Sequence, residues 1–377
     1  MKIWYVRKRL HTKEMPVMRT LIDNGHDVSF YILRPVSERD PDFVREMPTV
    51  AFLRRPLNWL ARLTRRSFYK LAPPSPWGVL REIRQHRPDF IGIHKHRLES
   101  WVVVAVARWC GVAVATNVEV PADRVGRSVR DRVLEAVGLL PRVQLGWLRA
   151  RNGADQILPN KFQHLPPMHH HDCAELIRQR SAQRRAGRPL RILAVAKLGL
   201  PRKRLDLAVS AVSALVAEGY AVELVIAGGG DKTAIARLAS EACCEHEKPF
   251  IEIKANVPYA EMAALYASCD VFLLPSRDEP YSISPLEAMA QGLPAVLSDT
   301  NNTADSVEHG VDGWICRTDD LASLIDCLRR FLDDPDLVET MGFAAWNKIR
   351  RDHDPQRWHA QFLVIADHAQ RLARQRD

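Results

Sequence analysis

The chain alternates short apolar runs with longer amphipathic segments, and the alternation occurs twice. In the first half, the runs KIWYV, HDVSFYIL, FIGIH, VAVATN and ADQILP predict strands, while MPVMRTLIDNG and residues 101–109 predict helices. The pattern restarts at RILAVAKL and continues with the apolar runs AVELVIAGGG, FIEIKANV, CDVFLLPS and PAVLSD. Strands that alternate with helices indicate parallel sheets covered on both faces.

A polar, arginine-rich stretch, RQRSAQRRAGRP, separates the two series and predicts a linker. At 377 residues the chain is too long for one ordinary core. We therefore expect an α/β protein with two doubly wound, Rossmann-like domains at residues 1–180 and 188–350. An amphipathic pattern over residues 351–377 predicts a C-terminal helix.

Charge is distributed unevenly between the two halves. Residues 1–187 carry 33 basic and 17 acidic side chains, whereas residues 188–377 carry 21 and 28. A basic half favours a polyanionic partner, such as an anionic lipid surface, a phosphate-bearing acceptor or nucleic acid; solvated surface charge is the alternative. Nucleic acid is disfavoured, because the sequence has neither an aromatic and basic recognition motif nor a zinc finger.

Cysteine usage indicates a reducing compartment. The seven cysteines form no C-x-x-C pair, and an odd number cannot all pair within one chain. The apolar residues before Arg7 are too few for a signal peptide, and the longest apolar run is interrupted by Arg108 and Gly111. We expect a cytoplasmic protein, with peripheral association at the inner face of the cell membrane as an option.

The strongest chemical signal is LPSRDEPYSISPLEAMAQGLPAVLSDT, residues 274–300, where Glu279 and Glu287 stand eight positions apart around a strand-to-helix turn. A helix start offers N–H groups to an anion, and carboxylates accept hydrogen bonds from hydroxyls, so the pattern suits a sugar nucleotide. Two plainer interpretations stay open. Ser284 and Glu287 also form a capping-box pattern, and Glu279 could be an ordinary loop residue.

The segment EPYSISPLEAMAQGLPAV resembles the E-x7-E signature of retaining glycosyltransferases with the GT-B fold, specifically family 4, the glycosyl transferases group 1. The resemblance implies two Rossmann-like domains facing a central cleft, with the C-terminal helix crossing back to the first domain. It also implies metal-independent transfer of a hexosyl group from a UDP- or GDP-linked sugar, with no further cofactor, to a cell-envelope glycan or lipid-linked acceptor. By this resemblance Glu279 is catalytic, Glu287 binds the ribose, and the backbone N–H groups of Ile283 and Ser284 hold the distal phosphate.

The segment VAKLGLPRKRLDLAVSA resembles the family's GRLxxxKGxD segment, which places Lys197 and Lys203 at the donor-binding cations. Preorganised cations stabilise a departing nucleoside diphosphate without a metal. Arg204 replaces the usual glycine, which predicts altered local backbone geometry. Gly229, in AGGGDK, lines the donor cleft in the family; the signal for a dinucleotide motif is weak there, because Thr233 occupies the third glycine position.

The first domain departs further from the family pattern. PDFIGIHKHR resembles the family's D-x-x-H-x-H segment and places the second catalytic candidate at His94. RKRLHTKE replaces the glycine-rich loop after the first strand, and VATNVEV lacks the family's next histidine. The candidate acceptor or sugar contacts are therefore Lys8, Arg9, His96, Asn117 and Glu119.

Residues 54–70 combine six basic side chains with six apolar or aromatic ones. As a helix they would lie on an anionic membrane surface or pack inward as a basic surface helix. No metal site is expected, because three consecutive histidines, His169, His170 and His171, cannot easily converge on one ion. Two other functions stay open: a nucleotide-sugar epimerase of the same fold, and a non-catalytic glycan-binding protein.

Overall fold

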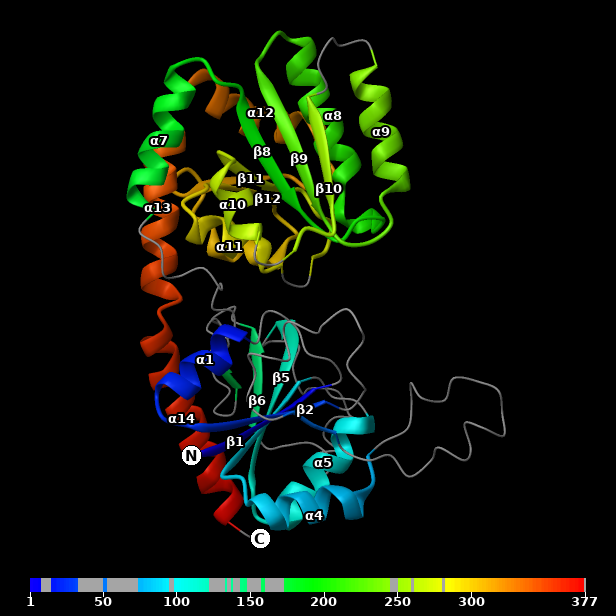
Figure 1. Ribbon diagram of the computed structural model, residues 1–377, viewed down its shortest axis with the longest axis vertical. Helices are drawn as coiled ribbons and strands as arrows, with labels where there is room; N and C mark the ends of the chain where they lie inside the picture. The colour runs from blue at the N-terminus through cyan, green and yellow to red at the C-terminus, as the bar shows by residue number, and fades with distance from the viewer. Residues whose placement is uncertain are drawn as a thin grey trace, which may run out of the picture. The chain divides into compact units, whose positions relative to one another are not determined.

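The computed structural model describes residues 1–7, 15–32, 50–52, 74–94, 98–121, 133, 137, 143–147, 157–159, 173–244, 250–258, 261–279 and 282–375. The chain forms two compact units (Figure 1). Unit 1 consists of Met1–Leu165 together with Asp354–Asp377, and unit 2 consists of Pro166–His353. Each unit is built on one parallel sheet, as the alternating pattern predicted.

Unit 1 contains a seven-stranded sheet in the order β3-β2-β1-β4-β5-β6-β7. Its strands are β1 (Lys2–Arg7), β2 (Asp27–Ile32), β3 (Val50–Phe52), β4 (Phe90–His94), β5 (Ala113–Pro121), β6 (Val143–Trp147) and β7 (Ile157–Pro159). Successive strands are added on one side of β1 and then on the other side, beginning with β4, so the strand order reverses between β1 and β4. Open α/β sheets bind ligands at the carboxyl ends of the strands at such a reversal.

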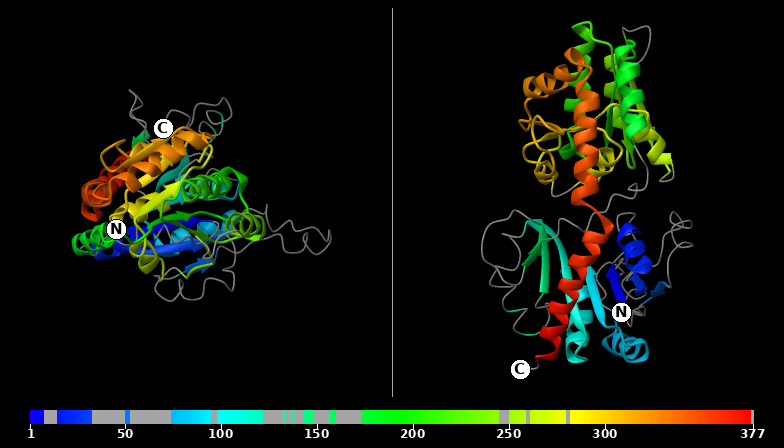
Figure 2. Two further views of the ribbon diagram at one scale, coloured as in Figure 1. Left: turned by 90° about the horizontal axis from the view of Figure 1, so that it is seen from above. Right: turned by 90° about the vertical axis from the view of Figure 1, so that its left-hand side faces the viewer.

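Helices cover both faces of this sheet. On one face α1 (Met15–Asp23) packs against α14 (Pro355–Arg374), which also contacts β4 and β5 (Figure 2). On the other face lie α4 (Pro76–His86) and α5 (Leu98–Trp109), which pack against each other. Two separate apolar clusters result, one containing Phe362 of α14 and the other Ile83 of α4. The C-terminal helix is therefore part of the core of unit 1.

Unit 2 contains a six-stranded sheet in the order β10-β9-β8-β11-β12-β13. Its strands are β8 (Leu190–Val195), β9 (Val222–Gly228), β10 (Ile251–Ala255), β11 (Val271–Leu274), β12 (Ala295–Ser298) and β13 (Gly313–Cys316). Every residue of β11 and β12 is buried, as expected for strands covered on both faces. The order reverses between β8 and β11.

Two sets of helices cover the sheet of unit 2. The set α8 (Leu205–Ala217), α9 (Thr233–Cys243) and α12 (Leu321–Asp333) packs side by side. The set α7 (Ala174–Arg185), α11 (Ser284–Ala290) and α13 (Leu337–Asp352) forms a second contacting group. Right-handed crossovers that run in opposite directions from β8 and β11 place α8 and α11 on opposite faces. A short helix, α10 (Met262–Ala267), precedes β11.

The arginine-rich stretch is a helix and not a linker, so that prediction was wrong. Residues 178–185 form most of α7, where Arg180 is only 3% exposed. Its guanidinium donates to the carbonyl of Cys269 at 3.1 Å and to that of Gln291 at 2.5 Å. Burial lowers the pKa of Arg180 to about 10, which leaves it charged at neutral pH. The first domain was expected to reach residue 180, but the units divide between Leu165 and Pro166.

No helix of the described part of the chain is both long and apolar enough to cross a membrane. The cysteines are Cys110, Cys173, Cys243, Cys244, Cys269, Cys316 and Cys327, and all seven are free thiols. Residues 54–70 and the three consecutive histidines lie outside the described residues.

Glycines let two backbone segments of unit 2 approach closely at the carboxyl edge of the sheet. Gly228 has φ +155°, and a Cβ atom there would lie 1.7 Å from the carbonyl oxygen of Ala196. The glycines of AGGGDK therefore serve a packing need directly beside the candidate donor-binding residues, since no other residue fits at this distance.

We expect Gly228→Ala to lower the free energy of unfolding by about 3 kcal/mol or more, because the new methyl group meets backbone that cannot move aside. Gly219→Ala is the matched control. Gly219 also has positive φ, +91°, but nothing lies within 4 Å of the added Cβ. Its cost should be limited to about 1–2 kcal/mol of backbone strain. Chemical denaturation followed by circular dichroism measures both, and equal losses would contradict the clash.

Candidate functional site

The carboxyl ends of β8 and β11 meet at the point where the strand order of unit 2 reverses, and the candidate donor residues follow these two strands. Lys197 comes two residues after β8, and Lys203 ends the short 3₁₀ helix η5 (Pro201–Lys203). Glu279 and the start of α11 follow β11. Two predicted groups that are far apart in the sequence are thus brought to one edge of the sheet.

Glu279 is held by two cations. Its Oε2 atom accepts hydrogen bonds from Lys203 Nζ at 2.7 Å and from Arg202 at 2.8 Å. Glu279 and Lys203 are only 3% and 7% exposed, while the Arg202 side chain is 43% exposed. A buried carboxylate requires such pairing, because desolvation of an unpaired charge is costly. Glu279 is therefore not an ordinary surface-loop glutamate.

Both cations bind the same oxygen of Glu279. Its other oxygen, Oε1, has no partner among the described residues. The carboxylate is thus fixed in orientation and keeps one acceptor for a hydroxyl group. Arg202 was not among the predicted site residues, since a charged residue beside a helix start is more often solvated. Only its contact with Glu279 identifies it.

The start of α11 is fixed by hydroxyl groups. Ser284 Oγ donates to the carbonyl of Val195 at 3.0 Å, which joins α11 to the end of β8. The backbone N–H of Ser282 donates to Thr303 Oγ1 at 2.9 Å. The N–H groups of Ile283 and Ser284, which were predicted to hold a phosphate, have no acceptor among the described residues. These two donors are therefore available to an anion.

Glu287 does not form the capping box that its spacing allowed. The cap residue, Ile283, has no side-chain bond, and Ser284 Oγ is occupied by Val195. Glu287 Oε2 instead accepts a hydrogen bond from the hydroxyl of Tyr266 at 2.8 Å. Burial raises the pKa of Glu287, and the Tyr266 hydroxyl opposes this shift. Nothing in the sequence marked Tyr266, which lies 21 positions earlier in a helix.

Lys197 lies beside the glycine turn. The residues on either side of it, Ala196 and Leu198, donate backbone hydrogen bonds to Ala227 and Gly229. The Lys197 side chain is exposed and has no charged partner in the described part of the chain. It differs in this respect from Lys203, which the buried pair occupies.

Arg204 has a left-handed backbone conformation, which glycine adopts more readily than other residues. Its φ and ψ are 49° and 40°, and its guanidinium pairs with Asp206 at 3.1 Å and with Asp319. At this position the backbone thus has a conformation that glycine favours, although the residue is arginine.

In unit 1, His94 and Asn117 are register partners on β4 and β5. Glu119 lies further along β5. Both strands end at the edge where β1 also ends. Lys8, Arg9 and His96 lie outside the described residues. The roles of these unit 1 residues stay predictions.

Residues 189–334 match the family model described as glycosyl transferases group 1. The chain is 32% identical to the amylovoran biosynthesis glycosyltransferase AmsK of Erwinia amylovora over 196 residues, 49% of this chain and 46% of AmsK. It is 31% identical to the putative colanic acid biosynthesis glycosyltransferase WcaL of Salmonella typhimurium over 48% of this chain and 45% of WcaL. The matched region thus spans about half the length of these relatives. The resemblance to group 1 is confirmed; family 4 and a retaining mechanism stay predictions.

Solved structures cover nearly the whole chain. The glycosyltransferase from Rickettsia africae has a TM-score of 0.72 at 12% identity and covers 98% of both chains. Anabaena Alr3699/HepE in complex with UDP has a TM-score of 0.70 at 14% identity and covers 98% of this chain and 100% of its own. These likenesses show the fold. Together with the two parallel sheets they confirm the predicted GT-B class.

We expect Lys203→Met to lower the free energy of unfolding by about 2–3 kcal/mol, because it leaves buried Glu279 with one half-exposed cation. Arg202→Met is the matched control and should cost about 1 kcal/mol or less, since its charge is largely solvated. Adding Glu279→Gln to Lys203→Met should restore part of the loss. Urea denaturation measures these differences. Equal costs for both single variants would show that the buried pair does not carry stability.

The raised pKa of Glu287 predicts a pH-dependent cost to stability. Between the ordinary value near 4.5 and the higher folded value, the folded state binds the proton more tightly than the unfolded state. Stability contributed by this group therefore falls as pH rises through that window and then stays constant.

Glu287→Gln removes this dependence. The free energy of unfolding of the variant minus that of the parent should increase from pH 4.5 upward and level off above the folded pKa. Urea unfolding at pH values from 4.5 to 8 measures the difference, and acid effects on other groups cancel in it. A difference that does not vary with pH would refute the raised pKa.

Proposed function

We propose that this chain, whose residues 189–334 match the glycosyl transferases group 1, is a retaining glycosyltransferase. It would move a hexosyl group from a UDP- or GDP-linked sugar to a cell-envelope glycan or a lipid-linked acceptor. The observation that carries the proposal is the Glu279 carboxylate, paired with two cations, beside two N–H groups at the start of α11 that have no acceptor among the described residues. An acceptor for hydroxyls next to donors for phosphate suits a sugar nucleotide.

Within this proposal Glu279 Oε1 orients the donor sugar and supports the positive charge that develops at its anomeric carbon. Two cations on Oε2 fix the carboxylate and lower its nucleophilicity, and Oε1 is left as an acceptor for sugar hydroxyls, which favours an orienting role over that of a nucleophile. Lys203 acts through Glu279 and is a positioning residue. Exposed Lys197 and the backbone N–H groups of Ile283 and Ser284 would stabilise the departing diphosphate. With these groups in place, the proposed reaction needs no metal.

Glu287 and Tyr266 would bind the ribose. A carboxylate that already accepts one hydrogen bond at Oε2 keeps acceptor capacity for a ribose hydroxyl. Gly229 would let the backbone approach the donor. On unit 1, His94 is the last residue of β4, and Asn117 and Glu119 lie in β5; they would contact the transferred sugar or the acceptor.

Similar proteins support the chemical class. AmsK and WcaL are named for the biosynthesis of amylovoran and colanic acid. Anabaena Alr3699/HepE, which shares the fold, has been crystallised in complex with UDP-glucose. The seven free thiols agree with a reducing, cytoplasmic setting.

The test uses exposed Lys197, because its replacement disturbs no contact among the described residues. We expect Lys197→Met to leave the unfolding midpoint unchanged and to weaken binding of UDP or GDP about tenfold, the loss of one charged contact. Arg237→Met removes a positive charge from the exposed face of α9 and is the control. Thermal shift measures binding of a panel of nucleoside diphosphates and sugar nucleotides.

Turnover separates the proposal from the other two functions. A transferase releases nucleoside diphosphate in the presence of an acceptor, whereas an epimerase forms an altered sugar nucleotide without one. Glu279→Gln should lower kcat about 100-fold or more while nucleotide binding persists. The proposal would be refuted if the protein binds glycan but neither binds nor turns over any sugar nucleotide.

A further inference from the structure

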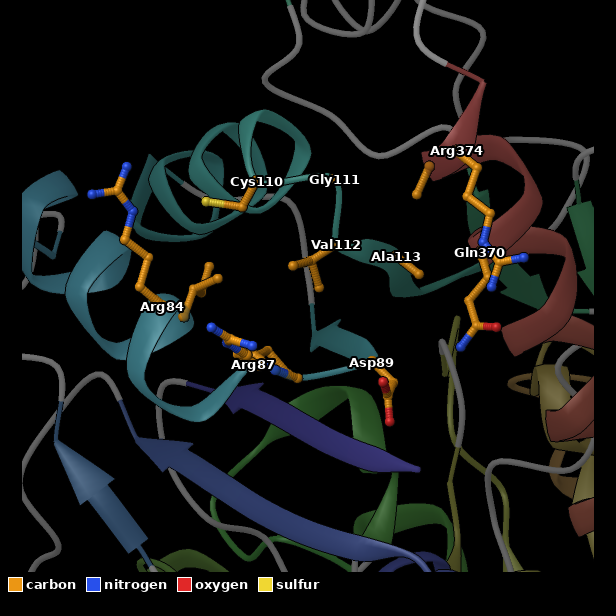
Figure 3. Close-up of a pocket in the computed structure, with 12 residues that line it drawn as sticks. Arg84, Arg87, Asp89, Cys110, Gly111, Val112, Ala113, Gln370 and Arg374 are labelled. Atoms are coloured by element: carbon orange, nitrogen blue, oxygen red, sulfur yellow. The ribbon is translucent and has the colours of Figure 1, made fainter.

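Unit 1 has a depression at the edge of its sheet opposite the predicted acceptor residues. Its volume is about 600 Å³, within the range of small-molecule sites. It lies where β4 and β5 begin, whereas His94 is the last residue of β4 and Asn117 is its register partner in β5. Figure 3 shows Arg84 and Arg87 on one side and Gln370 and Arg374 of α14 on the other. The depression is thus lined by helices from both faces of the sheet.

The arginines at this depression differ from their neighbours on the same helices. Arg81 of α4 and Arg371 of α14 pair with carboxylates, Glu82 at 3.6 Å and Asp367 at 3.1 Å. The arginines that line the depression have no carboxylate partner within the described part of the chain, and they are Arg84, Arg87 and Arg374. Three arginines without a carboxylate partner among the described residues therefore line one depression.

The charge and the acceptor groups of the lining define what would fit. Three arginines and one aspartate, Asp89, give a net charge of +2. Asp89 Oδ2 accepts a hydrogen bond from the backbone N–H of Lys2 at 2.7 Å, and its Oδ1 atom has no partner among the described residues. Gln370 Nε2 is directed at Met1 Sδ, which leaves its amide oxygen as an acceptor. Cations suit a phosphate, and the two remaining oxygens suit hydroxyl groups.

Arg87 occupies a position that favours glycine. It follows α4 with φ 48° and ψ 64°, and its N–H donates to the carbonyl of Ile83. Left-handed backbone at this helix end is ordinarily provided by glycine. An arginine here carries strain that the helix end itself does not require, although basic side chains do complement the helix dipole.

We propose that this depression binds a phosphorylated polyol, held by arginines from both of its sides, Arg84 and Arg87 on one and Arg374 on the other, with hydroxyl groups on Asp89 and Gln370. The size of the hollow exceeds that of a phosphate ion alone, and the net charge of the lining matches a phosphate monoester dianion. The ligand is a soluble sugar phosphate or the headgroup of a glycerophospholipid. The site does not depend on the proposed transferase activity.

Calorimetry on the full chain tests the site with glucose 6-phosphate, glucose and inorganic phosphate. We expect glucose 6-phosphate to bind, glucose to show no binding, and phosphate to bind more weakly. Arg84→Gln with Arg374→Gln should weaken binding at least tenfold. Arg81→Gln with Arg371→Gln is the matched control, which removes two paired arginines of the same helices and should change affinity less than twofold.

Sedimentation with phosphatidylglycerol or phosphatidylcholine vesicles separates the two sources. A lipid source predicts binding to phosphatidylglycerol that the first variant pair loses and the control keeps, and that soluble glycerol phosphate competes away. Arg87→Gly should weaken binding without lowering the unfolding midpoint, because it removes the side chain and relieves the backbone. The proposal is overturned if no probe binds in either assay, or if both variant pairs lose binding equally.

Discussion

The buried pair between Lys203 and Glu279 connects the two halves of the sheet in unit 2. Lys203 follows β8 and Glu279 follows β11, and a further backbone hydrogen bond joins Arg277 to Arg202 between the same two segments. Taking both charges out of water is costly, so the pair is favourable only where the surrounding backbone holds it in good geometry. The second cation, Arg202, keeps the carboxylate satisfied and orients it. Whatever binds at this edge meets a carboxylate whose position is already determined.

The rest of the edge depends on that arrangement. Ser284 attaches the start of α11 to the carbonyl of Val195, and Thr303 exchanges two hydrogen bonds with the backbone of Ser282. These bonds use side chains, and within the described part of the chain the N–H groups of Ile283 and Ser284 have no acceptor. The apolar strands beneath, fully buried in β11 and β12, supply the rigidity. Reactive groups thus lie at strand ends, and packing residues lie within the sheet.

Arginine serves three different purposes in this chain. Arg180 is buried and donates to two backbone carbonyls, Arg202 supports a carboxylate, and the arginines around the depression of unit 1 have no carboxylate partner among the described residues. Composition alone does not distinguish these three kinds of arginine. The arginine-rich composition of residues 178–189 therefore predicted a linker where α7 lies. Long side chains place a charge several ångströms from the backbone, so the partner is decided by which elements pack nearby.

The amino-acid sequence by itself determined the two-domain α/β class and the principal strands, because strand and helix periods and glycine turns are local properties. It also placed Lys197, Lys203, Glu279 and Ser284 in one candidate site, through spacings that resemble a known family. The sequence could not identify Tyr266 as the partner of Glu287 or Arg202 as the partner of Glu279, since each pair lies more than 20 positions apart. It could not separate capping from a tertiary contact at Glu287, because both use the same residue types. Those choices were made by the packing of α10, α11 and η5 at the carboxyl edge of the sheet, which brings distant side chains within hydrogen-bonding distance.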